Sequence, residues 1–272
     1  GHMIWDQTVP DALFETHPEY FPLKDADRKF GGGAGGFQRC LSNPEVFRRV
    51  SAHVLAWCGA DPDNRFTFDA ADSRGTWCDC GGCRKRGTVN GEFKITNLYH
   101  DFASRVVRHV LDRNPEARLD IYFYIDKAYP PDDPTIRYEG KHVRGVYCTC
   151  WPYARCYAHA LTDPTCEPNR KCLANLLAIL KICPRLYTYE YFTSSGLLYA
   201  PVQGTVARDI RDLAALGVEG FMTDTWGVKG TVVVLERDPD ARQEWLARWP
   251  SVYLSAKLHW DPGRDPETIM DE

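Results

Sequence analysis

The chain has 272 residues, 44% of them hydrophobic, which is enough to bury a core as one large domain or two small ones. A formal net charge of −4 and a pI near 6.1 give no basic surface of the kind that binds nucleic acid. No apolar run approaches the length needed to cross a bilayer. Composition therefore argues against a nucleic-acid-binding protein and against a membrane-spanning segment.

Apolar residues at helical spacing alternate along the chain with short β-prone runs. The predicted helices are residues 44–58, 95–111, 173–182 and 206–216, followed by two short helices within 242–258 that are broken at Pro250. The predicted strands are an extended start at 4–9 and then 66–69, 118–125, 143–151, 186–192 and 218–223. Ser42 or Asn43 is the candidate cap for the first long helix, and Pro44 suits its first turn.

This alternation predicts parallel βαβ units and hence an α/β fold. About six strands suit a doubly wound sheet and are too few for a complete (β/α)8 barrel. Acids and aromatics that follow successive strands favour the barrel, because barrels collect catalytic groups at the carboxyl ends of their strands. Gly1-His2-Met3 is typical of a cloning remnant. We expect one domain over residues 4–272, a TIM-type (β/α)8-like barrel that is incomplete at its N-terminal strands.

Three acids follow predicted strands and are the candidate catalytic residues: Asp72, Glu190 and Asp224. Asp72 comes shortly after the strand at 66–69, where a turn or a helix cap is the structural alternative. Glu190 has a tyrosine on either side, and a carboxylate among aromatics loses solvation and favours the protonated form that a general acid needs. Ion pairing is the alternative for Glu190. Asp224 has a similar position after the next strand.

Aromatic residues near these acids are candidate platforms for a sugar. Aromatic rings stack on the apolar C–H faces of sugars and leave the hydroxyl groups to polar side chains. A tryptophan taken alone is more often part of a core, and this alternative applies to each of them. The candidate substrate-binding rings are Trp77, Trp151, Tyr189 and Trp226.

Cys78, Cys80 and Cys83 form a C-x-C-x-x-C cluster whose geometry can wrap a tetrahedral ion. Cys40 or a histidine is the candidate fourth ligand. A disulfide within so short a segment would be strained, so a bridge from the cluster would have to reach elsewhere, for example to Cys40. Zinc, disulfides and free thiols all stay open, and we favour a structural zinc site.

The chain has 11 cysteines, an odd number, so at least one is free, bound to metal or paired with another chain. Cys156 and Cys166 can close a loop of moderate size by a disulfide if the compartment is oxidising. Cysteine usage leaves the compartment open between exported and cytosolic.

Seven short motifs follow one another in an order that is known from one family. They are His17-Pro-Glu-Tyr-Phe21, Cys40-Leu-Ser-Asn-Pro-Glu-Val46, Trp77-Cys-x-Cys-x-x-Cys83, Cys156-Tyr-Ala-His-Ala-Leu-Thr-Asp163, Leu186-Tyr-Thr-Tyr-Glu-Tyr191, Gly217-Val-Glu-Gly220 and Tyr253-Leu-Ser-Ala-Lys-Leu-His-Trp-Asp-Pro262. The series resembles the glycoside-hydrolase-like barrel domain catalogued as a domain of unknown function. Some of its members form glycoside hydrolase family 163, endo-β-N-acetylglucosaminidases that act on complex N-glycans.

The resemblance implies a TIM-type barrel whose first strands are supplied by upstream residues. It also implies export, a substrate contact from His159, and retaining hydrolysis in which the acetamido group of the substrate attacks the anomeric carbon. One acid then protonates the leaving oxygen and a second carboxylate orients the acetamide. Two departures stand out. The chain has Ala70-Ala71-Asp72 where members commonly carry Asn-Asp, and Met222-Thr223-Asp224 where they commonly carry Phe-Glu.

We therefore predict a glycoside hydrolase that acts on a β-linked N-acetylhexosamine-containing glycan. The alternatives are a non-catalytic carbohydrate-binding barrel that has lost the acid pair, and a metal-stabilised scaffold or partner-binding module. Strands missing from the barrel would leave apolar sheet edges uncovered. We expect self-association or a second chain that completes the barrel.

Overall fold

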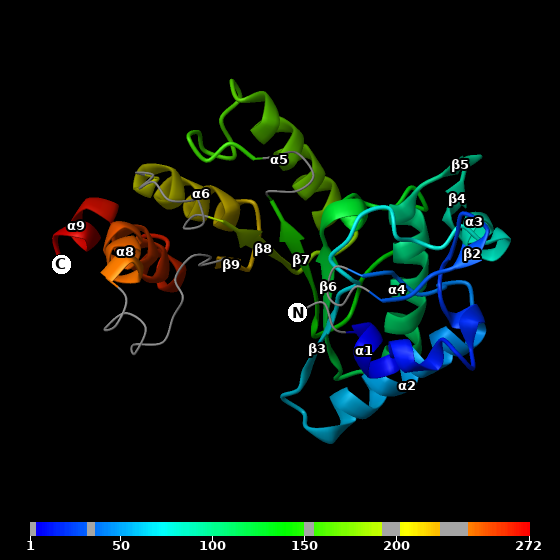
Figure 1. The fold of residues 1–272 in the computed structure, drawn as a ribbon. Coiled ribbons are helices and arrows are strands. Elements are labelled where there is room, and N and C mark those ends of the chain that lie inside the picture. The colour runs from blue at the N-terminus through cyan, green and yellow to red at the C-terminus, as the bar shows by residue number, and fades with distance from the viewer. Residues whose placement is uncertain (1–3, 32–35, 150–154, 192–201, 224–238) are drawn as a thin grey trace. The chain divides into compact units, whose positions relative to one another are not determined.

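The computed structural model describes residues 4–31, 36–149, 155–191, 202–223 and 239–272. Its fold is mixed α/β, as predicted, and contains helices and a five-stranded sheet (Figure 1). In sheet order the strands are β3 (Arg65–Phe68), β6 (Arg118–Phe123), β7 (Val143–Cys148), β8 (Leu186–Glu190) and β9 (Gly220–Thr223). β3 runs parallel to β6, and β8 runs parallel to β9. This sheet confirms the α/β class, and the eight-stranded barrel stays a prediction.

The chain divides into two compact units. The first contains Gly1–Val146 and Ala178–Pro184, and the second contains Tyr147–Leu177 and Arg185–Glu272. The single domain over residues 4–272 stays a prediction.

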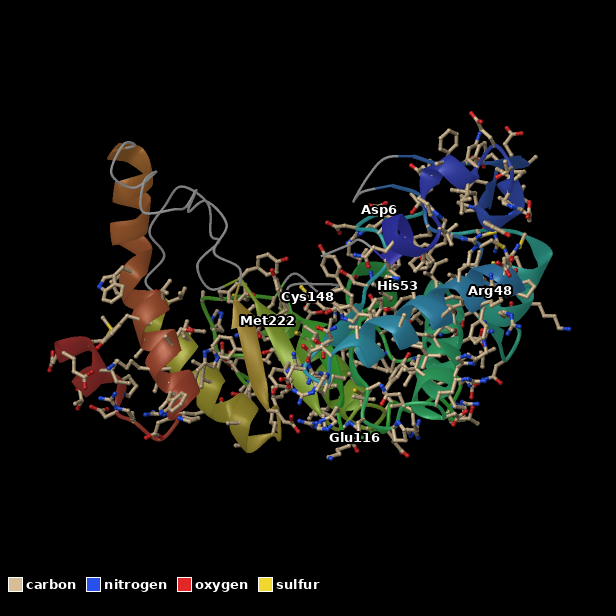
Figure 2. All side chains as sticks on the ribbon, turned by 90° about the horizontal axis from the view of Figure 1, so that it is seen from below. Asp6, Arg48, His53, Glu116, Cys148 and Met222 are labelled. Carbon is tan, nitrogen blue, oxygen red and sulfur yellow. The ribbon has the colours of Figure 1, made fainter. Side chains whose placement is uncertain are left out.

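Two long helices of the first unit match the sequence pattern closely. α2 (Pro44–Ala60) begins where Asn43 Oδ1 accepts hydrogen bonds from the backbone N–H groups of Glu45 and Val46. Its outer face carries the exposed Arg48, which pairs with Glu45 (Figure 2). α4 (Ile95–Leu111) buries a stripe of apolar residues, namely Leu98, Phe102, Val106, Val107 and Val110. Apolar periodicity predicted both helices, and a side-chain cap marks the start of α2.

The extended start predicted at residues 4–9 is wrong, because Ile4–Thr8 forms the short helix α1. Five residues are too few to be helical by propensity alone, so packing decides the conformation. Ile4 and Trp5 are buried, and the Trp5 indole N–H donates to Gln38 Oε1 at 2.9 Å. α1 packs against α2 (Figure 1). A contact with Gln38, 33 residues away, leaves no local signature in the sequence.

Two small antiparallel hairpins accompany α3 (Gly81–Gly87) in the first unit. β1 (Leu23–Lys24) pairs with β2 (Asp27–Arg28), and β4 (Thr88–Val89) pairs with β5 (Glu92–Phe93). Asn90 and Gly91 join β4 to β5 with φ of 52° and 82°. An Asn-Gly pair with positive φ at both positions is the strongest short hairpin signal, so sequence analysis had the means to find this one.

The second unit contains α5 (Glu167–Leu180), α6 (Gln203–Ala215), α8 (Pro239–Trp260) and α9 (Pro266–Asp271), although α5 ends in the first unit. The predicted break at Pro250 is wrong, since α8 continues through it. A proline inside a helix removes one hydrogen bond. Packing compensates, because Leu254 and Leu258 are buried in a core with three residues of α6 and Ile269 of α9.

Candidate functional site

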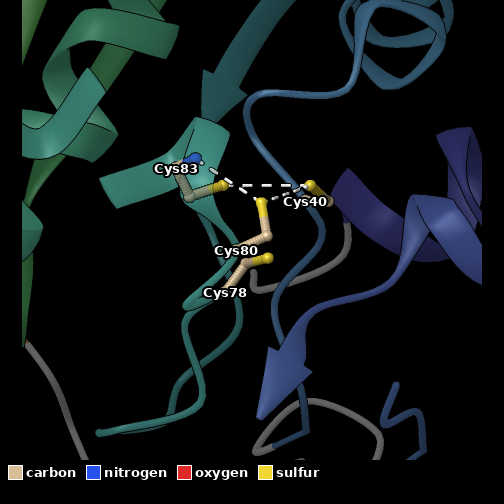
Figure 3. A group of neighbouring side chains, drawn as sticks. All are labelled: Cys40, Cys78, Cys80 and Cys83. Atoms are coloured by element: carbon tan, nitrogen blue, oxygen red, sulfur yellow. Dashed lines mark hydrogen bonds between the residues drawn. The ribbon is translucent and has the colours of Figure 1, made fainter. Parts of the chain in front are cut away.

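Four cysteines of the first unit converge on one point (Figure 3). Cys40 precedes α2, Cys78 and Cys80 lie in the segment between β3 and α3, and Cys83 belongs to α3. Their four Sγ atoms all lie within 4.8 Å of one another. The Cys40 Sγ atom is 3.7 Å from that of Cys80 and 3.8 Å from that of Cys83. The predicted grouping, with Cys40 as the fourth member, is confirmed.

Backbone contacts hold these cysteines in place. The N–H of Cys83 donates to Cys80 Sγ at the start of α3, and the N–H of Leu23 donates to Cys78 Sγ at 3.3 Å. Cys40 is anchored by its own N–H, which donates to the carbonyl of Tyr20 at 2.8 Å. The cluster is therefore assembled by three segments that are distant in sequence. Its geometry does not depend on any single loop.

The cysteines are free thiols, and their sulfur separations are far beyond the roughly 2 Å of a disulfide. Hydrogen bonds, first of all with Cys78, lower the pKa of Cys40. The hydrogen bond to Cys40 in turn raises the pKa of Cys78 to about 12, and contact with Cys40 also raises the pKa of Cys83. The thiolate form of Cys40 is therefore favoured, and its negative charge opposes ionisation of the neighbouring thiols. A bound cation removes that repulsion, so a buried set of four thiols suits a closed metal site.

Glu190 ends β8 and is the centre of a buried polar network in the second unit. Its Oε2 accepts from Arg155 Nη1 at 2.7 Å, from Thr149 Oγ1 at 2.5 Å and from the Tyr157 hydroxyl at 3.3 Å. Glu190 Oε1 is buried and has no hydrogen-bond partner among the described residues. The ion pair with Arg155 is the alternative that the sequence left open for Glu190.

Asp209 completes the network from α6 and was missed by sequence analysis. It pairs with Arg155 Nη2 and accepts from the N–H of Leu161 at 2.7 Å. Burial raises the pKa of Asp209 to about 6, and the charge of Arg155 opposes that rise. A detectable signal was present, because Asp209 interrupts the apolar stripe of α6 between Val206 and Ile210.

The other two candidate acids are placed differently. Asp72 is exposed in the segment between β3 and α3 of the first unit. Nearby Asp69 is buried, with Lys127 Nζ 3.4 Å from its Oδ1, and this ion pair favours a structural role for Asp69. Asp224 lies outside the described residues, as do the candidate sugar platforms Trp151 and Trp226. The catalytic roles of all three acids stay predictions.

The two aromatic candidates that are described have different surroundings. Trp77 is 2% exposed, and its N–H donates to Asp126 Oδ2 at 3.1 Å, so the geometry favours a structural role. Tyr189 is half-buried beside Tyr191, with 5.4 Å between the ring centroids. Successive residues of a strand point to opposite faces. Tyr189 and Glu190 therefore cannot line the same cleft from one face of β8.

His159 is exposed, and its Nδ1 lies 3.3 Å from Cys156 Sγ. With Cys166 Sγ, these ligand atoms form a second group in which all lie within 4.8 Å of one another. Cys156 and Cys166 are free thiols in this structure, and the disulfide considered between them is not formed. The family resemblance implied a substrate contact for His159, and no local motif indicated its place in this group.

Fold and site together define an α/β protein with a four-cysteine candidate metal site and a buried acid at a strand end. Residues 1–272 match the family described as "Domain of unknown function (DUF4838)", and the chain belongs to this family. Comparison with curated proteins found no match. In the described part of the chain, no helix is both long and apolar enough to cross a membrane. The family description names no activity.

Proposed function

We propose that the protein is a glycoside hydrolase that acts on a β-linked N-acetylhexosamine-containing glycan. The observation that carries the proposal is the carboxylate of Glu190. It lies at the carboxyl end of a parallel strand, is held through Oε2 by three donors, and has its Oε1 without a partner among the described residues. The seven motifs that resemble the hydrolase family add independent support.

The contact with Arg155 favours one catalytic role for Glu190 over the other. A carboxyl group held in place by a guanidinium suits the group that orients the acetamide and stabilises the positive charge that develops there. Proton donation to the leaving oxygen then requires a second acid. Glu190 has no exposed surface, so contact with substrate requires the groups that cover it to move.

Hydrolysis is tested with an aryl N-acetyl-β-glucosaminide and a fluorescently labelled complex N-glycan. We expect release of the aryl group or cleavage of the glycan, reduced about 100-fold or more in Asp72→Asn or Asp224→Asn and in Glu190→Gln. Glu219→Gln, which alters an exposed ion pair with Arg185, is the control and should keep full activity. Thermal unfolding of each variant separates a catalytic loss from a folding defect.

Two outcomes would contradict hydrolysis. Binding of the glycan by calorimetry without any turnover would indicate the alternative, a carbohydrate-binding protein that has lost its acid pair. Neither binding nor turnover would leave the metal-stabilised scaffold as the better description.

We also propose that Cys40, Cys78, Cys80 and Cys83 hold a structural zinc ion. Four thiolates in a closed, largely buried site match the ligand set of structural zinc, and no position is left open for a substrate. Elemental analysis of the purified protein tests this directly. A zinc content that falls by about one equivalent in Cys83→Ser supports the assignment, and a protein without metal after purification under reducing conditions contradicts it.

A further inference from the structure

Cys156, His159 and Cys166 form a second group of potential ligands, in the second unit. Around a zinc ion with ordinary bond lengths, a sulfur and a nitrogen ligand in tetrahedral positions are about 3.6 Å apart. The Cys156 Sγ to His159 Nδ1 distance of 3.3 Å is close to that value. The third ligand atom, Cys166 Sγ, lies within 4.8 Å of both. Small side-chain rotations would bring all three atoms to bonding distance.

The backbone that carries Cys156 and His159 is fixed by one buried amide. Asn169 has no exposed surface, and its Oδ1 accepts from the N–H of Cys156 at 2.9 Å. Its Nδ2 lies 2.9–3.0 Å from the carbonyl oxygens of Cys156, His159 and Ala160. Two of the three ligands are therefore held by a residue of α5 before any ion binds. Such preorganisation lowers the entropy cost of binding a ligand.

Cys166 is fixed in a different way. It directly precedes α5, and its carbonyl accepts the N–H of Arg170 at 3.0 Å, while its own N–H donates to the carbonyl of Asp163. The backbone of this third ligand therefore has a defined position before any ion binds.

The exposure of this group differs from that of the four-cysteine cluster. Cys166 is 8% exposed, Cys156 is half-buried and His159 is exposed. Two thiolates and an imidazole suit Zn²⁺ better than Mg²⁺ or Ca²⁺, which prefer oxygen ligands. Three protein ligands with one side open to solvent leave a fourth position for water or a small ligand.

We propose that Cys156, His159 and Cys166 form an open zinc site that is separate from the four-cysteine cluster. It exchanges its metal more readily than the closed cluster, because solvent and chelators reach it directly. The proposal does not depend on hydrolysis.

The test uses the full chain, stripped of metal under reducing conditions, reloaded with Zn²⁺ and freed of excess metal. We expect about two equivalents of zinc, of which one passes quickly to a chromogenic chelator. The Cys156→Ser/Cys166→Ser double variant should keep about one equivalent and lose the fast phase. His159→Ala should speed the fast phase further.

A control variant and a mass measurement keep the test decisive. Cys172→Ser replaces a buried cysteine near these ligands, and serine can keep its polar contacts with Tyr147 and Thr149, so both phases should persist. Unchanged zinc content and an unchanged fast phase in the double variant would overturn the proposal. So would a Cys156–Cys166 disulfide in protein purified without reductant in the presence of zinc, detected by alkylation and mass spectrometry.

Discussion

Arg155 Nη1 donates to Glu190 Oε2 across 2.7 Å, and neither side chain has any exposed surface. The other terminal nitrogen of the same guanidinium contacts Asp209, so one buried cation stands between two buried carboxylates. Removing a charge from water is costly, and only a partner with good geometry offsets that cost. The network therefore fixes the end of β8 against α6 within the second unit.

The first prediction concerns this network. Arg155→Met should lower the free energy of unfolding by about 3–5 kcal/mol, because it leaves two carboxylates buried without their cation. The measurement is denaturant unfolding near neutral pH. Arg185→Met removes the partner of Glu219 from an exposed pair in the same unit, and should cost only about 0–1 kcal/mol. An equal decrease in the free energy of unfolding for Arg155→Met and Arg185→Met would contradict a structural role for Arg155.

The second prediction concerns the metal of the four-cysteine cluster. A strong chelator or Cys83→Ser should destabilise the first unit by about 4 kcal/mol or more, since the remaining thiols would be buried without the cation. Differential scanning calorimetry with and without chelator measures the loss. Cys58→Ser changes a cysteine outside both ligand groups and should leave the chelator effect intact. A melting curve that chelator does not alter argues against a structural ion.

The third prediction uses two adjacent glycines of α3. A Cβ added at Gly82 would lie 2.6 Å from Ser42 Oγ, whereas nothing lies within 4 Å of one added at Gly81. Gly81→Ala should be neutral or stabilising by up to about 1 kcal/mol through helix propensity. Gly82→Ala should cost about 1–3 kcal/mol by overpacking. Ser42→Ala should recover part of that loss in the double variant. Denaturant unfolding of the wild type, the two glycine variants and the double variant measures these differences in free energy.

The fourth prediction is a pH dependence that arises from His100. Its ring is fully buried, with Nδ1 2.7 Å from the Tyr138 hydroxyl and Nε2 3.1 Å from the Lys127 carbonyl. Burial lowers the pKa of His100 to about 3. An unfolded histidine titrates near 6.5. At a pH below that value, the unfolded chain therefore binds a proton at this residue and the folded chain does not. This contribution to stability is complete above about pH 6.5 and is lost as the pH falls toward 3.

The slope expected from this one group is about 1.4 kcal/mol per pH unit below pH 6. His100→Gln should be less stable at neutral pH and show a shallower slope between about pH 4.5 and 6. Replacement of the exposed His17 by Gln is the matched control for the loss of an imidazole. Parallel curves for wild type and His100→Gln would show that His100 is protonated in the folded state.

Part of the candidate site could be predicted because its signals are local. The C-x-C-x-x-C spacing brings three thiols together within one short segment, and a fourth ligand was needed from elsewhere. The Glu190 network gave no such signal. Its partners Arg155 and Asp209 lie 35 and 19 positions away in sequence, and an arginine in a loop has no pattern that indicates which acid it will meet.

By itself the sequence determined the α/β class, the stretches that become α2 and α4, and the cysteines of the first cluster. Helical periodicity, capping by Asn43 and the spacing of the cysteines each involve residues only a few positions apart. These signals can therefore be read from the sequence without knowledge of tertiary contacts. Only the tertiary structure decided that residues 4–8 are helical, that Glu190 is ion-paired, and that His159 stands beside two thiols. Each of these depends on burial and on partners brought together by folding, where desolvation sets the preferred conformation and charge.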